Sequence, residues 1–469
     1  MAFLIGGANT ESAAYQIDNS GLFNDGQSQA LTRTHGASGS TRTFTFSCWV
    51  KFSDPKTGSS ASDCCHGIFA SEEEAGHQFF ISTDEGQIFR IADYQDGSYN
   101  LHLQTNRKFR DHSAWYHFCI IFDTTDGTQG DRCKLFVNGV RETSFSTEVY
   151  PSQNTDLYGN DNQAHFIGRR GGSNTMYFDG YIADVNFIDG TAAAATEFGE
   201  TNDNGVWIPK KYGGSYGNNG FFLEFGNTGT GQGANKFASD TSGNGNHYDT
   251  NNFSGQYKMT DTPTNNFCTL NPLHKSTTDV VLSKGNTEVV SGYSSGWQHC
   301  AATMAVRNGK WYWEANALAV AATDKTSIGV FQFDTTDVDF IGVTNTDRSS
   351  KGISGHGAGT GSYSYADDDI IMCGMDLDNN KVYWGKNGTW FGSLDPAAGS
   401  GSTTQTIDNS NFCVPAVGGY GGSIWQLNFG NPTFSISSGN TDANGYGNFE
   451  YSVPSGFFAL NTKNLAEYG

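Results

Sequence analysis

The sequence predicts an all-β protein in which two antiparallel, jelly-roll-like β-sandwich domains are joined by a connector rich in Gly and Asn. Short apolar and aromatic runs recur along the chain, and turn residues separate them at about the 8–12-residue spacing of sandwiches. Composition agrees, because 60 of the 469 residues are Gly, 34 are Phe, 21 are Tyr and only 16% are charged. Soluble domains usually carry roughly 25% charged residues, so uncharged Asn, Ser, Thr and Gly must solubilise these turns.

The first domain is expected to span residues 1–200. Its strands are predicted over residues 43–52, 66–71, 77–83, 87–94, 115–123, 133–140, 165–170 and 176–190. One stretch resembles a helix, AAAATEF at residues 192–198, and Thr191 stands where it would cap the N-terminus.

Three motifs of this domain occur in a characteristic order. Trp115-Tyr116-His117 leads into LFVNG at residues 135–139, and FDGYIADVNF at residues 178–187 closes the unit. This order resembles the laminin-G-like group of concanavalin-type jelly rolls, whose members commonly bind carbohydrates or extracellular proteins. Each motif also has a purely structural interpretation: Asn138-Gly139 makes a good type I′ turn, and the two aromatic residues suit a core and its rim.

A connector is expected over residues 201–275, where Gly, Asn, Thr and Ser surround short apolar islands. We expect it to contribute a strand or two that pack on a neighbour, with Pro263 and Pro272 fixing an extended crossing. The tail, residues 436–469, is expected to dock through Phe457 and Phe458.

The second sandwich is expected over residues 276–435. It contains NGKWYWEA (308–315), IGV (328–330), MCGMDLDNNKVYWGKNGTWFG (372–392) and FCVPAVGGYGGSIWQLNFG (412–430). These blocks in this order resemble the SPRY domain, a β-sandwich that binds partners through its loops and performs no chemistry. The resemblance implies a binding protein.

The whole arrangement resembles virion proteins of tailed bacteriophages, of the tail-fibre or host-recognition type. The resemblance implies a position on the particle surface or tail, synthesis in the host cytoplasm, and contact with other phage virion proteins. It also implies a ligand on the host surface, either glycan or protein. The start, MAFLIGGANTES, lacks the basic region of a secretory signal, which agrees with this expectation. The competing hypothesis is a capsid or tail decoration protein that uses both sandwiches for protein–protein contacts.

Charge and hydropathy exclude some partners. A net charge of −21 would repel a nucleic-acid backbone, so no nucleic acid is expected. No apolar run approaches the ~18 residues of a membrane span, so no membrane insertion is expected. Nine irregularly spaced cysteines fit free thiols better than a disulfide framework.

The sequence predicts no enzyme and no catalytic residues. Retaining glycoside hydrolysis needs two carboxylates about 5 Å apart, which residues two apart on one strand would supply. Glu72-Glu73-Glu74 are adjacent and therefore alternate between faces. No G-x-S-x-G nucleophile elbow is expected, because the two matches to that pattern, residues 213–217 and 292–296, precede no helix-like run. No H-E-x-x-H and no phosphate-binding Gly loop is present. A glycan-degrading enzyme remains the minor alternative.

No cofactor is expected, but one loop is a candidate calcium site. Asp123, Asp126 and Asp131 lie within nine residues, DTTDGTQGD, and could offer several oxygen ligands. The alternative is that these carboxylates form turns, because Asp before Gly is a common turn residue.

Candidate ligand-binding residues are loop aromatics beside polar side chains. Sugars stack one apolar face on an aromatic ring and direct their hydroxyls at polar partners. The candidates are Tyr94, Asp96, Tyr99, Arg169, Arg170, Trp390 and Asp395. Most Trp and Tyr of a sandwich are structural, so a core role is the alternative for each. Because single-site sugar affinity is weak, we expect a homo-oligomer, with a trimer favoured, that gains avidity from its copies.

Overall fold

The computed structural model describes residues 4–5, 15–56, 65–74, 76–171, 176–292, 298–320, 326–333, 350–354, 365–401, 407, 409–419 and 421–469. It confirms the predicted all-β fold of antiparallel sandwiches. The chain forms two compact units, residues 11–264 (the first unit) and residues 265–469 with residues 1–10 (the second unit). Each unit is described by itself.

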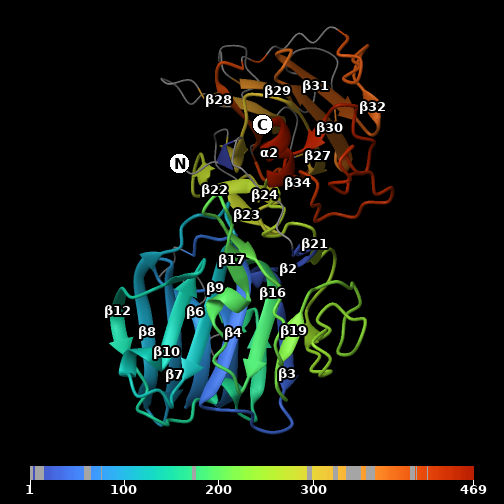
Figure 1. Cartoon of the computed structure of the whole chain (residues 1–469). Coiled ribbons are helices and arrows are strands. Elements are labelled where there is room, and N and C mark those ends of the chain that lie inside the picture. Colours follow the sequence, from blue (N-terminus) through green and yellow to red (C-terminus); the bar gives the residue numbers. More distant parts are fainter. Residues whose placement is uncertain are drawn as a thin grey trace. The chain divides into compact units, whose positions relative to one another are not determined.

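Two sheets form the first unit, whose strands run from blue to yellow-green in Figure 1. One sheet has the order β11 (Val140–Arg141), β10 (Cys133–Val137), β9 (Tyr116–Asp123), β4 (Thr43–Phe52), β16 (Gly180–Asp189), β2 (Ser20–Phe23) and β21 (Lys258–Met259), with β19 (Phe221–Leu223) also paired to β16. The other has the order β12 (Phe145–Val149), β8 (Ser98–Lys108), β7 (Ile88–Gln95), β6 (His77–Asp84), β5 (Gly67–Glu74), β13 (Ala164–Ile167), β3 (Ala30–Thr34) and β20 (Asp249–Asn251).

Phenylalanines from both sheets fill the space between them. Phe46 of β4 stacks on Phe69 of β5 with ring centroids 4.8 Å apart, and Phe44 of β4 meets Phe79 of β6 at 5.9 Å. All four rings are buried. Because strand side chains alternate between faces, each strand that places one residue in this core places its neighbours on the outer face.

Shorter elements complete the first unit. β14 (Arg169–Arg170) pairs with β15 (Met176–Tyr177), and β17 (Gly199–Thr201) pairs with β18 (Trp207–Pro209). Single 3₁₀ turns occupy Asp25–Gln27, Gln129–Asp131, Tyr158–Asn160 and Ala195–Glu197.

The helix predicted over residues 192–198 is wrong. Only Ala195–Glu197 turn, as a 3₁₀ helix, and Ala194 rather than Thr191 precedes it. The cause is Thr45 of β4, whose hydroxyl donates to the Thr191 carbonyl at 2.9 Å and accepts from the Ala193 N–H at 2.9 Å. These bonds hold the start of the segment against the sheet in a non-helical conformation.

Residues 201–264, which the sequence analysis assigns to a connector, supply strands to the first unit. β19 pairs with β16, β20 with β3 and β21 with β2. Both sheets are therefore extended by this stretch.

The second unit also contains two sheets. One has the order β22 (Leu270–Lys275), β25 (Gln298–Ala302), β33 (Phe412–Gly419), β28 (Thr326–Phe333) and β29 (Ser350–Ser354). The other has the order β23 (Val281–Ser283), β24 (Glu288–Val290), β34 (Ile424–Asn428), β27 (Lys310–Ala319), β30 (Asp369–Asp376), β31 (Lys381–Lys386) and β32 (Thr389–Trp390). β35 (Phe458–Ala459) joins β27 in parallel, and β1 (Leu4–Ile5) pairs in parallel with β26 (Met304–Ala305).

The tail packs within the second unit. Phe457 is buried, and Phe458 stacks on Tyr468 of the C-terminal helix α2 (Thr462–Tyr468) with centroids 3.8 Å apart. The buried carboxylate of Glu314 accepts the backbone N–H groups of Glu450 and Tyr451 at 2.9 and 2.8 Å. These bonds tie the tail to β27.

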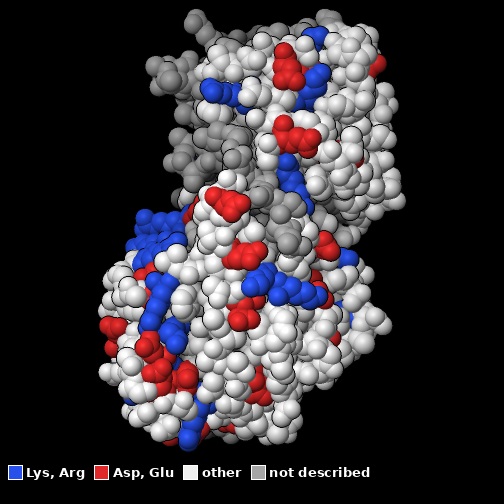
Figure 2. Space-filling model, in the orientation of Figure 1, with Lys and Arg blue, Asp and Glu red and all other residues white. Residues whose placement is uncertain are grey.

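The surface carries few charged side chains, as the low charged fraction of the sequence predicts, and the described cysteines lie inside the units. On the face shown in Figure 2, uncharged residues predominate and Lys, Arg, Asp and Glu are scattered among them. The eight cysteines in the described ranges are buried, while Cys64 lies outside those ranges. In the same ranges no helix is long and apolar enough to cross a bilayer.

Candidate functional site

The outer face of the sheet containing β5–β8 brings three cross-strand rows together. Register pairs Phe80 with Ala92, and Ala92 with His102. The rows on either side are Ser82, Arg90 and Gln104, and Gln78, Tyr94 and Tyr99. Because Phe79 and Ile81 point into the core, Phe80 between them points outward.

Two guanidinium groups cover Phe80. Arg170 of β14 lies with Cζ 3.7 Å from the ring centroid, and Arg90 of β7 lies with Cζ 5.0 Å from it. The Phe80 ring is only 1% exposed as a result. We call Phe80, Arg90, Tyr94, Tyr99, His102 and Arg170 the Phe80 platform.

Arg90 organises the exposed side of the platform. Its guanidinium donates to Asp84 Oδ2 at 2.9 Å and to the Tyr99 hydroxyl at 2.8 Å. The Tyr99 ring stacks on His102 at 4.4 Å and meets the edge of Tyr94 at 4.9 Å. Tyr99 nevertheless remains 37% exposed. The platform therefore offers solvent an aromatic ring whose position is fixed from three sides.

A tight turn sets this geometry. Asp96 and Gly97, with φ of 49° and 86°, form the two-residue connection between β7 and β8. Positive φ at both positions is what a type I′ hairpin requires. The turn places Tyr94 opposite Tyr99.

Burial controls the charge state of the platform. Burial and, after it, the nearby Arg90 guanidinium lower the pKa of His102 to about 4, so this ring is neutral near pH 7. Burial, followed by repulsion from Arg90, also lowers the pKa of Arg170. Burial alone would raise the pKa of Asp84, but the Glu85 N–H and Arg90 together hold it below its ordinary value.

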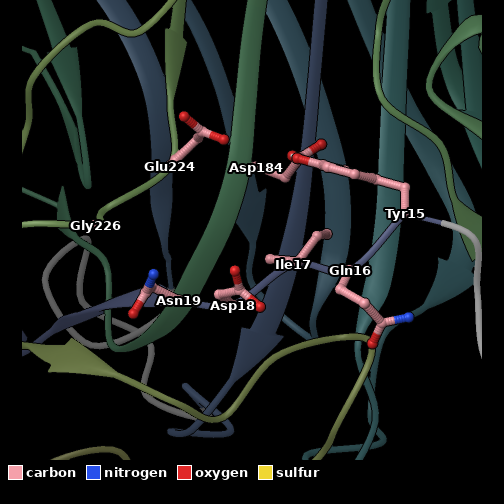
Figure 3. Close-up of a pocket in the computed structure, with 8 residues that line it drawn as sticks. All are labelled: Tyr15, Gln16, Ile17, Asp18, Asn19, Asp184, Glu224 and Gly226. Atoms are coloured by element: carbon pink, nitrogen blue, oxygen red, sulfur yellow. The ribbon is translucent and has the colours of Figure 1, made fainter.

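A second feature of the first unit is a pocket of about 190 Å³, which we call the Asp184 pocket. In Figure 3, Tyr15 reaches toward Asp184, and Glu224 lies beyond them. Its lining consists of Tyr15, Gln16, Ile17, Asp18, Asn19, Asp184, Glu224 and Gly226.

Asp184 is the buried group of this pocket, only 4% exposed. It has φ of 52° at a break in the register between β16 and β4, a β-bulge that re-aims its side chain. The Tyr15 hydroxyl donates to Oδ1 at 2.7 Å and Asn186 Nδ2 donates to Oδ2 at 3.2 Å. Burial outweighs these bonds and raises the pKa of Asp184 to about 7, so this carboxyl group exchanges a proton near neutral pH.

The size of the Asp184 pocket limits what it could hold. Sites for drug-sized ligands enclose roughly 300–1,000 Å³, so this one would hold a single functional group rather than a saccharide chain. Glu224, the second carboxylate, lies 3.9 Å from Lys211 Nζ.

Residues 24–197 match the family model described as the concanavalin A-like lectin/glucanases superfamily. The first unit contains a concanavalin A-like domain. No curated protein sequence matches the chain.

Several solved structures are similar to parts of the chain. The SPRY domain of human HERC1 has 17% identity and a TM-score of 0.26, covering 34% of this chain and 96% of that one. A heptameric SAP-like pentraxin from Limulus polyphemus has 14% identity and a TM-score of 0.29, covering 39% and 80%. Domain 4 of the arabinanase AbnA from Geobacillus stearothermophilus, solved with arabinotriose, has 14% identity and a TM-score of 0.23, covering 32% and 63%. At these identities the likeness concerns the fold alone.

Five of the sequence-predicted ligand-binding residues lie in the concanavalin A-like domain. Tyr94, Tyr99 and Arg170 meet in the Phe80 platform. Arg169 instead packs over Phe166, with Cζ 4.3 Å from the ring centroid. Asp96, in the adjoining turn, has Oδ1 3.0 Å from Nε2 of His77.

The other two candidates lie in the second unit. Trp390 is half-buried, with its ring 6.4 Å from that of Tyr312. Asp395 accepts the Ala398 N–H at 3.1 Å, as a turn residue does.

The three candidate calcium ligands, which we call the Asp123 loop, are engaged by the protein. Asp123 accepts from the Thr125 hydroxyl at 2.6 Å, and Asp126 accepts from the Thr128 N–H at 2.7 Å. Asp131 pairs with Arg141 at 2.7 Å. In the described part of the chain no three His, Cys, Asp or Glu residues are grouped to hold a metal. The bonds of Asp123 and Asp126 are of the kind that turns make, and Asp131 forms an ion pair.

Sequence reasoning missed Phe80, Arg90 and Asp184. Two adjacent phenylalanines in HQFFIST require one to face outward, and the lone Arg in IFRIADY shares that face, so a signal existed for both. Asp184 has a weaker signal, an acidic residue inside the apolar strand GYIADVNF, and the sequence does not indicate the bulge.

Proposed function

We propose that this chain is a non-enzymatic binding protein of a tailed-bacteriophage virion, of the tail-fibre or host-recognition type. Its concanavalin A-like domain would bind a host-surface glycan at the Phe80 platform. The observation that carries the proposal is the exposed Tyr99 ring, held rigidly by Arg90 and His102. A sugar can stack its apolar face on this ring. Gln104, in the row of Arg90, donates one amide N–H to Asp84 at 3.0 Å and can direct its second N–H at a sugar hydroxyl.

The setting of this binding is also part of the proposal. The order of motifs along the chain supports a position on the particle surface or tail, contact with other virion proteins, and synthesis in the host cytoplasm. A platform with one exposed ring would bind one sugar weakly. A trimer would convert weak sites into firm adhesion through effective concentration.

The test uses the purified full chain on a glycan array and on host cells. We expect glycan binding, and competition with phage adsorption. Tyr99→Ala should weaken glycan binding at least tenfold, about 1.4 kcal/mol, because it removes the exposed ring. Val140→Ala is the matched control, since Val140 is 69% exposed and lies on β11 of the opposite sheet.

Two results would overturn the proposal. A blank array without competition for adsorption would favour the decoration role, in which both sandwiches contact other virion proteins. Equal loss of binding in the Tyr99 and Val140 variants would show that the platform is not the site.

One observation favours a second candidate, hydrolysis in which the Asp184 pocket admits one functional group of a glycan while the rest of the chain lies outside it. A buried carboxyl group with a pKa of about 7 has the protonation behaviour of a general acid. The proposal expects no new reducing ends when the protein is incubated with the glycan that it binds. Release of reducing ends that Asp184→Asn abolishes would establish the hydrolase instead.

A further inference from the structure

Arg170 is a half-buried cation with one polar partner in the described structure. Its Nη1 lies 3.5 Å from Met176 Sδ, and its guanidinium rests on Phe80. A guanidinium carries five N–H donors, so most of its donors are uncommitted. Among the described residues no carboxylate forms an ion pair with Arg170.

The neighbouring charges do not compensate Arg170. Tyr99, Cys65 and Asp84 oppose the lowering of its pKa, and the one carboxylate among them, Asp84, already pairs with Arg90 at 2.9 Å. Glu72, on the same face, accepts from Gln78 at 3.2 Å. Arg90 itself repels Arg170 across the Phe80 ring, and burial removes water that would screen the two charges. A partly desolvated cation is stabilised when a ligand supplies the counter-charge.

Arg90 also has an N–H donor that its described neighbours leave without an acceptor. Its two terminal nitrogens donate to Asp84 and Tyr99, while its buried Nε has no hydrogen-bond partner among the described residues. His102 beside it is neutral near pH 7, and its buried Nε2, a donor or an acceptor according to the tautomer, also has no partner in the described part of the chain. The two guanidinium groups, which can only donate, therefore give the platform more hydrogen-bond donors than acceptors around one aromatic ring.

From this geometry we infer that the Phe80 platform contains an anion subsite, in which Arg170 binds a carboxylate, sulfate or phosphate group carried by an acidic glycan. The inference rests on the proposed glycan-binding function and names the class of glycan. Arginine binds such groups through two parallel hydrogen bonds, which fixes the orientation of the ligand as well as its charge. The exposed Tyr99 ring belongs to the same platform, so the sugar ring would stack there while its anionic substituent reaches Arg170.

The acidity of the chain makes this subsite specific. With a net charge of −21, the protein as a whole repels anions. Binding of an acidic glycan must therefore depend on a local group and not on a general positive field.

The experiment compares matched ligands on the full chain by calorimetry at low salt. The ligands are a neutral oligosaccharide and the same oligosaccharide bearing a uronate, a sulfate or a phosphate. We expect at least one acidic form to bind tenfold or more tightly than the neutral form. Comparison of the three acidic forms shows which anionic group, carboxylate, sulfate or phosphate, the subsite binds.

Adjacent arginines provide the matched variants. Arg170→Gln should abolish the preference, so that the acidic and neutral forms bind this variant with equal affinity. Arg169→Gln removes the same charge one residue away, over Phe166, and should keep the preference. Arg170→Lys preserves charge and should retain part of it, and the melting temperature of each variant reports folding.

The outcomes separate this inference from the proposed function. Neutral and acidic forms bound equally, or equal losses in the Arg169 and Arg170 variants, would overturn the anion subsite while glycan binding stands. Failure to bind any saccharide would overturn both.

Discussion

Lys51 of β4 and Asp261 form an ion pair inside the first unit, with Nζ and Oδ2 2.7 Å apart and side chains only 1% and 0% exposed. Asp261 Oδ1 also accepts the indole N–H of Trp115 at 3.0 Å, and its carbonyl accepts the Ser20 hydroxyl at 2.6 Å. Asp261→Asn would keep an acceptor for Trp115 but remove the charge that compensates Lys51. The substitution therefore tests the effect of one buried negative charge while the hydrogen bond to Trp115 is kept.

The expected loss of stability is large. Breaking a buried ion pair by removing one partner costs about 3–5 kcal/mol, because the remaining charge stays desolvated. For a unit of this size the urea m-value is about 3 kcal/mol/M, so the midpoint should fall by about 1 M or more. Lys51→Met combined with Asp261→Asn should recover at least half of that loss, since no unpaired charge then remains.

Hydrogen exchange of β4 and β9 amides under increasing urea measures this unit separately from the rest of the chain. The control is Asp156→Asn, which breaks an ion pair to Arg42 whose side chains are 45% and 60% exposed. Exposed pairs contribute little, so this variant should unfold as the wild type does. An Asp261→Asn midpoint equal to that of the control would refute the reasoning.

Three further predictions concern pH and calcium. Burial lowers the pKa of the stacked rings of His35 and His165 to about 2 and about 4, whereas the unfolded chain protonates them near 6.5. Stability should therefore fall as pH drops from about 6.5 to 4; melting temperatures at pH 7 and 4.5 should show a smaller drop for His35→Leu, and an unchanged drop would contradict this cause. The pKa of Asp184 is raised from 3.8 to about 7, so its burial destabilises the fold increasingly over that range. Asp184→Asn should raise the melting temperature at pH 8 and not at pH 4, and no gain at pH 8 would argue against a desolvated carboxylate. Millimolar calcium should leave the melting temperature unchanged, because the Asp123 loop is hydrogen-bonded internally; an increase would revive the calcium hypothesis.

Strands and turns were the most predictable parts of the fold. The predicted strand at residues 43–52 coincides with β4 (Thr43–Phe52), because apolar residues recur there at every second position, from Phe44 to Phe52. The turn at Asn138-Gly139 has φ of 49° and 74°, as a type I′ turn requires. Both signals are local, so the sequence contains them in full.

Long-range contacts were not predictable. The strand partners of β19, β20 and β21 are remote in sequence, and three-residue apolar islands do not distinguish a sheet strand from a loop. At the site, the tyrosines were identifiable as aromatic residues near a turn. The placement of Arg170 over Phe80 depends on β14 contacting β5 and β6, which no local pattern reveals.

The late strands also bear on how the protein is made. β2 and β3 are synthesised early, but their partners β21 and β20 follow more than two hundred residues later. Until that stretch has left the ribosome, the nascent chain presents unpaired sheet edges, which readily pair with other chains. A recombinant fragment that stops near residue 200 should therefore aggregate, whereas one extended to Thr264 carries every strand needed to cover those edges.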